Sequence, residues 1–134
     1  MPIIRVINWP SRVRPIAEDR RINPDDFFDA LERDGAFTKA LGEKLRRACI
    51  DAHVPGVESQ DLVTVSFDSG YGVGDPTLVI VVEGLFDRPD RTKEVRDRLA
   101  WMLGEAAKPY IHGHWTVETL VQRFDPTVDA YWKG

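Results

Sequence analysis

The order of strand-like and helix-like segments repeats once along these 134 residues, and this repeat constrains the fold more than any other feature. Each half has a short β-branched or alternating strand pattern, a one-sided helical pattern, a proline that stops the helix, and a second strand pattern. The sequence therefore predicts two β-α-β units in tandem. The expected strands are 3–7, 61–68, 77–86 and 115–124, and the expected main helices run from Phe37 to Ala52 and from Thr92 to just before Pro109.

A helical crossover between the two strands of each unit is what a parallel strand pair requires. We therefore expect an α+β fold with pseudo-twofold symmetry, in which a four-stranded mixed sheet carries two main helices on one face. Two arrangements satisfy this order of elements. One is the split, ferredoxin-like arrangement, and the other pairs the two strands of each unit side by side.

The segment between the first strand and the first main helix carries weaker signals. Residues 11–22 show no hydrophobic period, which is typical of a loop. Asn23 and Pro24 form a helix start, with Asp25 and Asp26 placed to favour the positive end of the helix dipole. This short helix is expected to break near Asp34-Gly35.

Composition limits the function classes. Hydrophobic residues make up 43% and charged residues 30% of the chain, which is typical of a globular domain, and the net charge of −4 argues against nucleic acid or an anionic membrane as partner. The longest apolar stretch, 78–82, is far too short to cross a bilayer, and no basic-then-apolar leader is present. A single cysteine, Cys49, is compatible with a reducing compartment, so we expect a soluble, cytoplasmic protein.

Three stretches of sequence resemble the tautomerase superfamily. They are the initial MPII, the helix-to-strand segment LGEKLRRACIDAHVPGVESQDLVTVSFD, and the strand-to-helix segment VIVVEGLFDRPDRTKEVRDRLAWMLGEAA. That superfamily includes 4-oxalocrotonate tautomerase, carboxymethyl-hydroxymuconate isomerase, the haloacrylate dehalogenases and macrophage migration inhibitory factor. Its longer members carry two β-α-β units in one chain and associate as trimers, so the resemblance implies a homotrimer.

The resemblance also sets the expected domain organisation. Residues 1–134 form a single domain, with a first unit of about 2–68 and a second unit of about 77–125. Residues of about 11–36 look like an insertion into the first unit, and 126–134 form a C-terminal tail.

The residue that would carry the chemistry is Pro2. If Met1 is removed, Pro2 becomes an N-terminal secondary amine, and burial among apolar side chains disfavours its charged form, so that it is a usable base. The resemblance implies that Pro2 is the general base of a cofactor-independent tautomerase, with no metal. If Met1 is retained, Pro2 is an ordinary residue at the end of a strand.

The substrates of such enzymes are small keto or unsaturated carboxylic acids, which need a cation. Arg88 and Arg91, at the end of the third strand and the start of a helix, are the first candidates because two guanidinium groups suit a carboxylate. A similar Arg-x-x-Arg turn occurs in the cis-type haloacrylate dehalogenases. Arg12 and Arg14 are the second candidates.

Several alternatives remain open at this stage. A dehalogenase or hydratase would need a carboxylate to activate water, for which Glu118 and Asp125 are available. A catalytically silent member that retains Met1 would serve as an interaction or structural protein. His112 and His114 lack neighbouring ligands and favour no metal site, whereas Trp101 lies off the apolar stripe and is interpreted as a subunit contact.

Overall fold

The computed structural model describes residues 2–7, 24–68, 77–111, 115–130 and 132–133; for 24–34, 37 and 61 it describes the backbone alone. The elements follow the predicted order of two β-α-β units. They are β1 (Ile3–Ile7), α2 (Pro24–Asp51), the 3-10 helix η1 (Gln60–Leu62), β2 (Thr64–Asp68), β3 (Thr77–Phe86), α3 (Lys93–Ala107), the 3-10 helix η2 (Lys108–Tyr110) and β4 (Thr116–Phe124).

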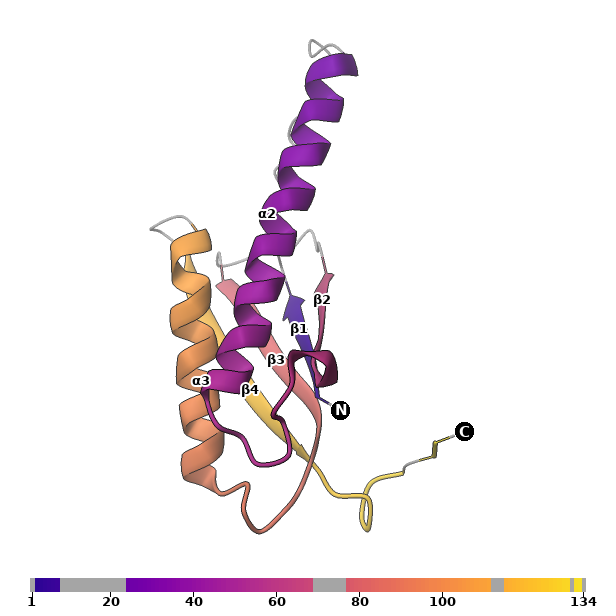
Figure 1. Ribbon diagram of the computed structural model, residues 1–134, viewed down its shortest axis with the longest axis vertical. Coiled ribbons are helices and arrows are strands. Elements are labelled where there is room, and N and C mark those ends of the chain that lie inside the picture. Colours follow the sequence, from indigo (N-terminus) through magenta and orange to yellow (C-terminus); the bar gives the residue numbers. More distant parts are fainter. Residues whose placement is uncertain (1, 8–23, 69–76, 112–114, 131, 134) are drawn as a thin grey trace.

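The four strands form one mixed sheet in the order β2-β1-β3-β4 (Figure 1). Strands β1 and β2 are parallel, β3 and β4 are parallel, and the two units meet through the antiparallel pair β1 and β3. The strands of each unit are therefore direct neighbours. This order confirms the side-by-side arrangement and excludes the ferredoxin-like one, in which the strands of a unit are separated.

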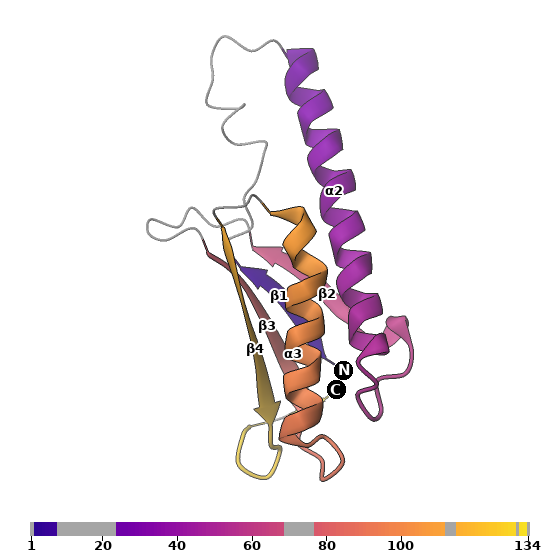
Figure 2. The ribbon, with the colours of Figure 1, turned by 90° about the vertical axis from the view of Figure 1, so that its left-hand side faces the viewer.

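Both helices lie on the same face of the sheet, as Figure 2 shows. The core fills the space between them, because every second residue of the central strands points toward the helices. Ile4 and Val6 of β1 are fully buried there, opposite Val82 and Ile80 of β3. The helices contribute the residues of their apolar stripes: Leu41, Leu45, Ala48, Cys49 and Ala52 from the first, and Leu99, Leu103 and Ala107 from the second.

The predicted helix break at Asp34-Gly35 is wrong. Helix α2 is continuous over 28 residues, which corresponds to about 42 Å, and Figure 1 shows it rising well beyond the sheet. Its start at Pro24 agrees with the prediction. A glycine costs a helix only about 1 kcal/mol relative to alanine, and the helix does not end there because no proline follows Gly35 until Pro55.

The face of the sheet opposite the helices is not covered by any described element. Ile3 and Leu120 are 40% and 51% exposed on it. Arg5 crosses its centre, donating to Asp68 of β2 at 2.8 Å and to Glu83 of β3 at 3.1 Å. Its pKa is raised by these two partners, first through the hydrogen bond to Asp68. We call this surface the open face.

The C-terminal tail leaves the end of β4 and runs away from the sheet (Figure 1). Its first residues form a turn in which Asp125 accepts hydrogen bonds from the backbone N–H of Thr127 at 2.9 Å and its hydroxyl at 2.6 Å. These bonds lower the pKa of Asp125. Beyond the turn, Val128 and Trp132 are 82% and 86% exposed.

Candidate active site

Pro2 lies at the end of the sheet where β1 and β2 begin. It is buried, and its carbonyl oxygen accepts a 3.3 Å hydrogen bond from the backbone N–H of Thr64. The next two residues turn to opposite faces: Ile3 lies on the open face and Ile4 is buried in the core. Pro2 is therefore buried at the end of the sheet where the inner strand β1 begins, whereas Met1 lies outside the described residues.

Arg91 is the one buried charged residue among the described side chains, with 9% of its surface exposed. Its Nε donates to the carbonyl oxygen of Pro55 at 2.9 Å, and its Nη1 donates to that of Phe86 at 2.7 Å. Burial lowers the pKa of this guanidinium, and the nearby charge of Arg88 lowers it further. Arg91 thus ties the turn after α2 to the end of β3.

Arg88 lies beside Arg91 but is far more accessible, with 44% of its side chain exposed. Its Nη2 forms a 2.6 Å ion pair with Asp90, which is also exposed. Two such exposed charges attract each other only weakly because water screens them. The Arg88 guanidinium therefore remains accessible to a ligand carboxylate that competes with Asp90.

The two guanidinium groups meet under Gly56, in the turn that follows α2. A Cβ atom on Gly56 would overlap Arg88 Nη1 and would lie 2.8 Å from Arg91 Nη2. The backbone of Gly56 has a φ of +83°, which side-chain-bearing residues rarely adopt. A glycine is needed here both for the turn and for the approach of the arginines, which we call the Arg88/Arg91 pair.

The Arg88/Arg91 pair and Pro2 are far apart in the sequence but lie at the same end of the sheet, because β1 begins where the antiparallel strand β3 ends. Ile3 is opposite Glu83, and β3 continues to Phe86, about 10 Å farther on at the usual rise per residue. The pair follows beyond that point, in the β3–α3 connection of Figure 1. The structure thus brings the two arginines together and places Pro2 at their end of the sheet.

Of the other residues singled out in the sequence, some lie outside the described parts of the chain and others are exposed. Arg12, Arg14, His112 and His114 lie outside the described residues. Glu118 is exposed in β4, and Asp125 forms the turn described above. Trp101 is 67% exposed on α3, which is compatible with a contact but does not test it.

Two other arginines make contacts that sequence patterns did not indicate. Arg46 donates from α2 to the carbonyl oxygens of Gln60 and Val63. Arg5 joins three strands on the open face. Arginines are common on solvated helix faces and edge strands, so only the folded contacts distinguish these two.

In the described parts of the chain no cluster of three or more potential metal-ligating side chains occurs, and none of the helices there is long and apolar enough to cross a membrane.

Comparisons with known proteins bear on the fold. No family model matches the sequence, and no curated protein matches it. Solved structures do resemble it. Among them are the asymmetric trimer of a wild-type fused 4-OT (TM-score 0.55, 14% identity, 92% of this chain and 86% of that chain), macrophage migration inhibitory factor of Toxoplasma gondii (0.53, 16%, 99% and 96%), and a member of the cis-3-chloroacrylic acid dehalogenase family (0.50, 15%, 90% and 75%).

These neighbours are tautomerase-superfamily proteins, as the resemblance in the sequence implied. At such identities the likeness establishes the fold and nothing finer. The chain has the tautomerase β-α-β fold, with its four-stranded mixed sheet and two helices.

Proposed function

We propose that the chain is a cofactor-independent tautomerase that acts on a small keto or unsaturated carboxylic acid. The observation that carries this proposal is the place of Pro2. The chain has a tautomerase fold, and in this chain Pro2 directly follows Met1. Pro2 lies at the start of a central strand, and its carbonyl oxygen is hydrogen-bonded to Thr64 of the neighbouring strand. Removal of Met1 would give this buried position a secondary amine, which is the only base that the proposal requires.

The reaction would be a proton transfer between carbon and oxygen of the substrate. The unprotonated Pro2 amine takes a proton from the carbon next to the carbonyl, and the electron pair of the broken C–H bond moves into the enolate. The ammonium then returns the proton to the other terminus of the enolate system, so no atom is gained or lost. The Arg88/Arg91 pair would hold the carboxylate through charge-assisted hydrogen bonds, with Arg12 and Arg14 as second candidates for that role.

We propose further that the active form is a cytoplasmic homotrimer. The support is the open face, which carries exposed Ile3 and Leu120 on a sheet whose other face is covered by both helices. Large hydrophobic side chains exposed on an uncovered sheet face favour a partner, and a solved neighbour is a fused 4-OT trimer. The cytoplasmic location rests on the single cysteine, Cys49, which is a buried free thiol.

One observation favours a second candidate function, that of a catalytically silent member with Met1 retained. Arg91 already donates to two backbone carbonyls, so one arginine of the pair has a structural role that needs no ligand. A dehalogenase or hydratase is less well supported, because Asp125 is engaged in its own turn and Glu118 is exposed to solvent in β4.

The decisive experiment compares protein with and without Met1, verified by intact mass, on a test substrate such as phenylenolpyruvate. The processed form should ketonise it, with activity rising with pH as the amine loses its proton. The unprocessed form should be folded and inactive, because acylation delocalises the nitrogen lone pair into the amide. Equal activity in both forms would refute the catalytic proline, and inactivity of both across several keto acids would favour the silent member.

A further inference from the structure

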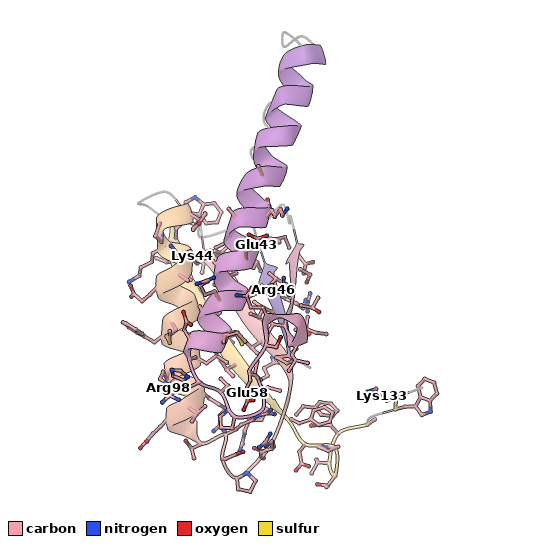
Figure 3. All side chains as sticks on the ribbon, viewed as in Figure 1. Glu43, Lys44, Arg46, Glu58, Arg98 and Lys133 are labelled. Atoms are coloured by element: carbon pink, nitrogen blue, oxygen red, sulfur yellow. The ribbon has the colours of Figure 1, made fainter. Side chains whose placement is uncertain are left out.

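Arg46 connects α2 to the segment just before β2. The side chain is half-buried, and its Nε donates to the carbonyl oxygens of Gln60 and Val63, each at 3.1 Å. Its Nη2 donates to Gln60 again, at 2.6 Å. Figure 3 shows Arg46 on the side of α2 that faces η1 and β2. The planar guanidinium therefore fixes both carbonyl groups relative to the helix, because its donors have a rigid geometry.

One peptide group links Arg46 to Pro2. The carbonyl of Val63 accepts from Arg46, and the N–H of the same peptide, which belongs to Thr64, donates to the carbonyl oxygen of Pro2 at 3.3 Å. In a trans peptide these two groups share a rigid plane and point in opposite directions. Arg46 thus sets the orientation in which the Thr64 N–H meets Pro2.

The surroundings restrain this peptide plane further. The Val63 side chain is only 3% exposed and packs in the core. The Val63 N–H donates to Gln60 at 3.0 Å, and Gln60 is the residue whose carbonyl Arg46 contacts twice. Ile3 follows Pro2 and lies in register with Thr64. The contact between Arg46 and Val63 is therefore part of the alignment of β1 with β2 at the Pro2 end.

We propose that Arg46 is a positioning residue for the Pro2 amine. Proline has no amide N–H, so once Met1 is gone its carbonyl is the backbone group that ties it to the sheet. Fixing that carbonyl restrains rotation about the bond between Cα and the carbonyl carbon, and this rotation directs the ring nitrogen. This role rests on the proposed function of Pro2, but the anchoring of Pro2 that it requires is measurable without any turnover.

The test uses processed protein with Arg46→Met, and Arg47→Met as the matched control. Arg47 is the next residue on the same helix and is exposed, and the same substitution removes the same charge there. Hydrogen exchange of individual amides is measured at Val63 and Thr64, together with the rate at which an amine-directed electrophile labels Pro2. Arg46→Met should speed exchange at Thr64 by about tenfold, the scale of one charge-assisted hydrogen bond, and change the labelling rate of Pro2, whereas Arg47→Met should do neither.

Kinetics on phenylenolpyruvate then separate positioning from substrate binding. Arg46→Met should lower kcat by about tenfold with KM within about twofold of the parent, because a positioning residue acts through Pro2 and not on the substrate directly. Arg46→Lys keeps a cation but lacks the planar fork, and it should recover part of the kcat. Should Arg46→Met fail to fold, Arg46→Lys becomes the test variant, with an intermediate loss expected in each measurement.

The proposal is overturned if a folded Arg46 variant speeds exchange at Val63 but leaves Thr64 exchange and Pro2 labelling as in the parent. That result would confine Arg46 to the η1 turn. If no form of the protein turns over any keto acid, the proposed function fails, but exchange at Thr64 and labelling of Pro2 still decide whether Arg46 anchors the N-terminal residue.

Discussion

Arg91 joins the start of α3 to the turn after α2, because its Nε donates a 2.9 Å hydrogen bond to the carbonyl oxygen of Pro55. Among the described residues, the side chain of the neighbouring Arg88 makes an exposed ion pair with Asp90, although the two arginines are three residues apart. The two arginines therefore have different environments within one turn. We expect the buried Arg91 to contribute mainly to stability and the exposed Arg88 mainly to ligand binding.

We expect Arg91→Ala to lower the free energy of unfolding by about 2–4 kcal/mol, because it removes two hydrogen bonds that a charged donor makes to the carbonyl oxygens of Pro55 and Phe86. Arg88→Ala should cost less than about 1 kcal/mol, the usual limit for an exposed ion pair. Urea unfolding of both variants measures the difference. Equal losses would show that the contacts of Arg91 with Pro55 and Phe86 contribute little.

Gly56→Ala should destabilise the protein by about 1–2 kcal/mol, since a residue with a Cβ is strained at a φ of +83°. The added methyl group would also displace Arg88 and Arg91. Gly35→Ala is the control, because Gly35 lies in α2 and no described atom outside its own helix backbone and chain neighbours lies within 4 Å of its Cβ position. That change should stabilise the helix by about 0.5–1 kcal/mol. Thermal unfolding of the two variants should shift in opposite directions.

The sequence predicted the elements well where one local pattern decided them. The alternation of Ile4 and Val6 with Arg5 defines a strand with one buried face, and Pro55-Gly56 marks the end of α2. Residues 24–51 form one helix because a single glycine is a weak signal that the flanking turns outweigh. That outcome depends on the whole helix and could not be derived from the two letters Asp34-Gly35.

The candidate site was only partly accessible from the sequence. The spacing of Arg88 and Arg91 predicted that they would share a turn, but not that Gly56, more than thirty residues earlier, would cover them. Arg46 was missed because its partners are backbone carbonyls of Gln60 and Val63. Backbone acceptors have no residue type, so no sequence pattern identifies such a contact.

Cys49 should be unreactive toward thiol reagents at pH 8 until the protein unfolds. Burial raises the pKa of its thiol from 9.0 to about 11, and only the thiolate reacts. The native state therefore binds this proton more tightly than the unfolded state does. The resulting stability is fully present below pH 9.0 and is lost as the pH rises through about 11.

Urea unfolding between pH 8 and pH 11 measures this loss, with Cys49→Ala as the reference that lacks the thiol. The parent should lose more stability than the variant over this range. Parallel curves for the two proteins, or rapid labelling of the native thiol at pH 8, would contradict the burial of Cys49.

Light scattering should give a mass three times that of the 15.2 kDa chain. If the open faces meet, Leu120→Lys should dissociate the assembly, because Leu120 is 51% exposed on that face and a lysine there would bury a charge. Trp101→Ser is the comparison, since Trp101 is exposed on α3, which packs against the opposite face. Dissociation by Trp101→Ser alone would place the contact on the helices, and a monomeric parent would end the trimer proposal.

The last prediction concerns the accessible arginine. In processed protein, Arg88→Ala should lower kcat/KM for a keto acid by about ten- to a hundredfold, the scale of one charge-assisted contact with a carboxylate. Arg88 suits this test better than Arg91, because among the described residues its side chain pairs with the carboxylate of Asp90 and not with backbone carbonyls, so the fold should persist. The loss should also depend on the substrate: an analogue in which an ester replaces the carboxylate should react at a similar rate with parent and variant. Arg47→Ala removes an exposed charge elsewhere and should leave both rates unchanged.

If Arg88→Ala slows the ester as much as the acid, Arg88 acts on the chemistry or on the fold rather than on the carboxylate. If it slows neither, the carboxylate is held elsewhere, and Arg12 and Arg14 become the next residues to replace.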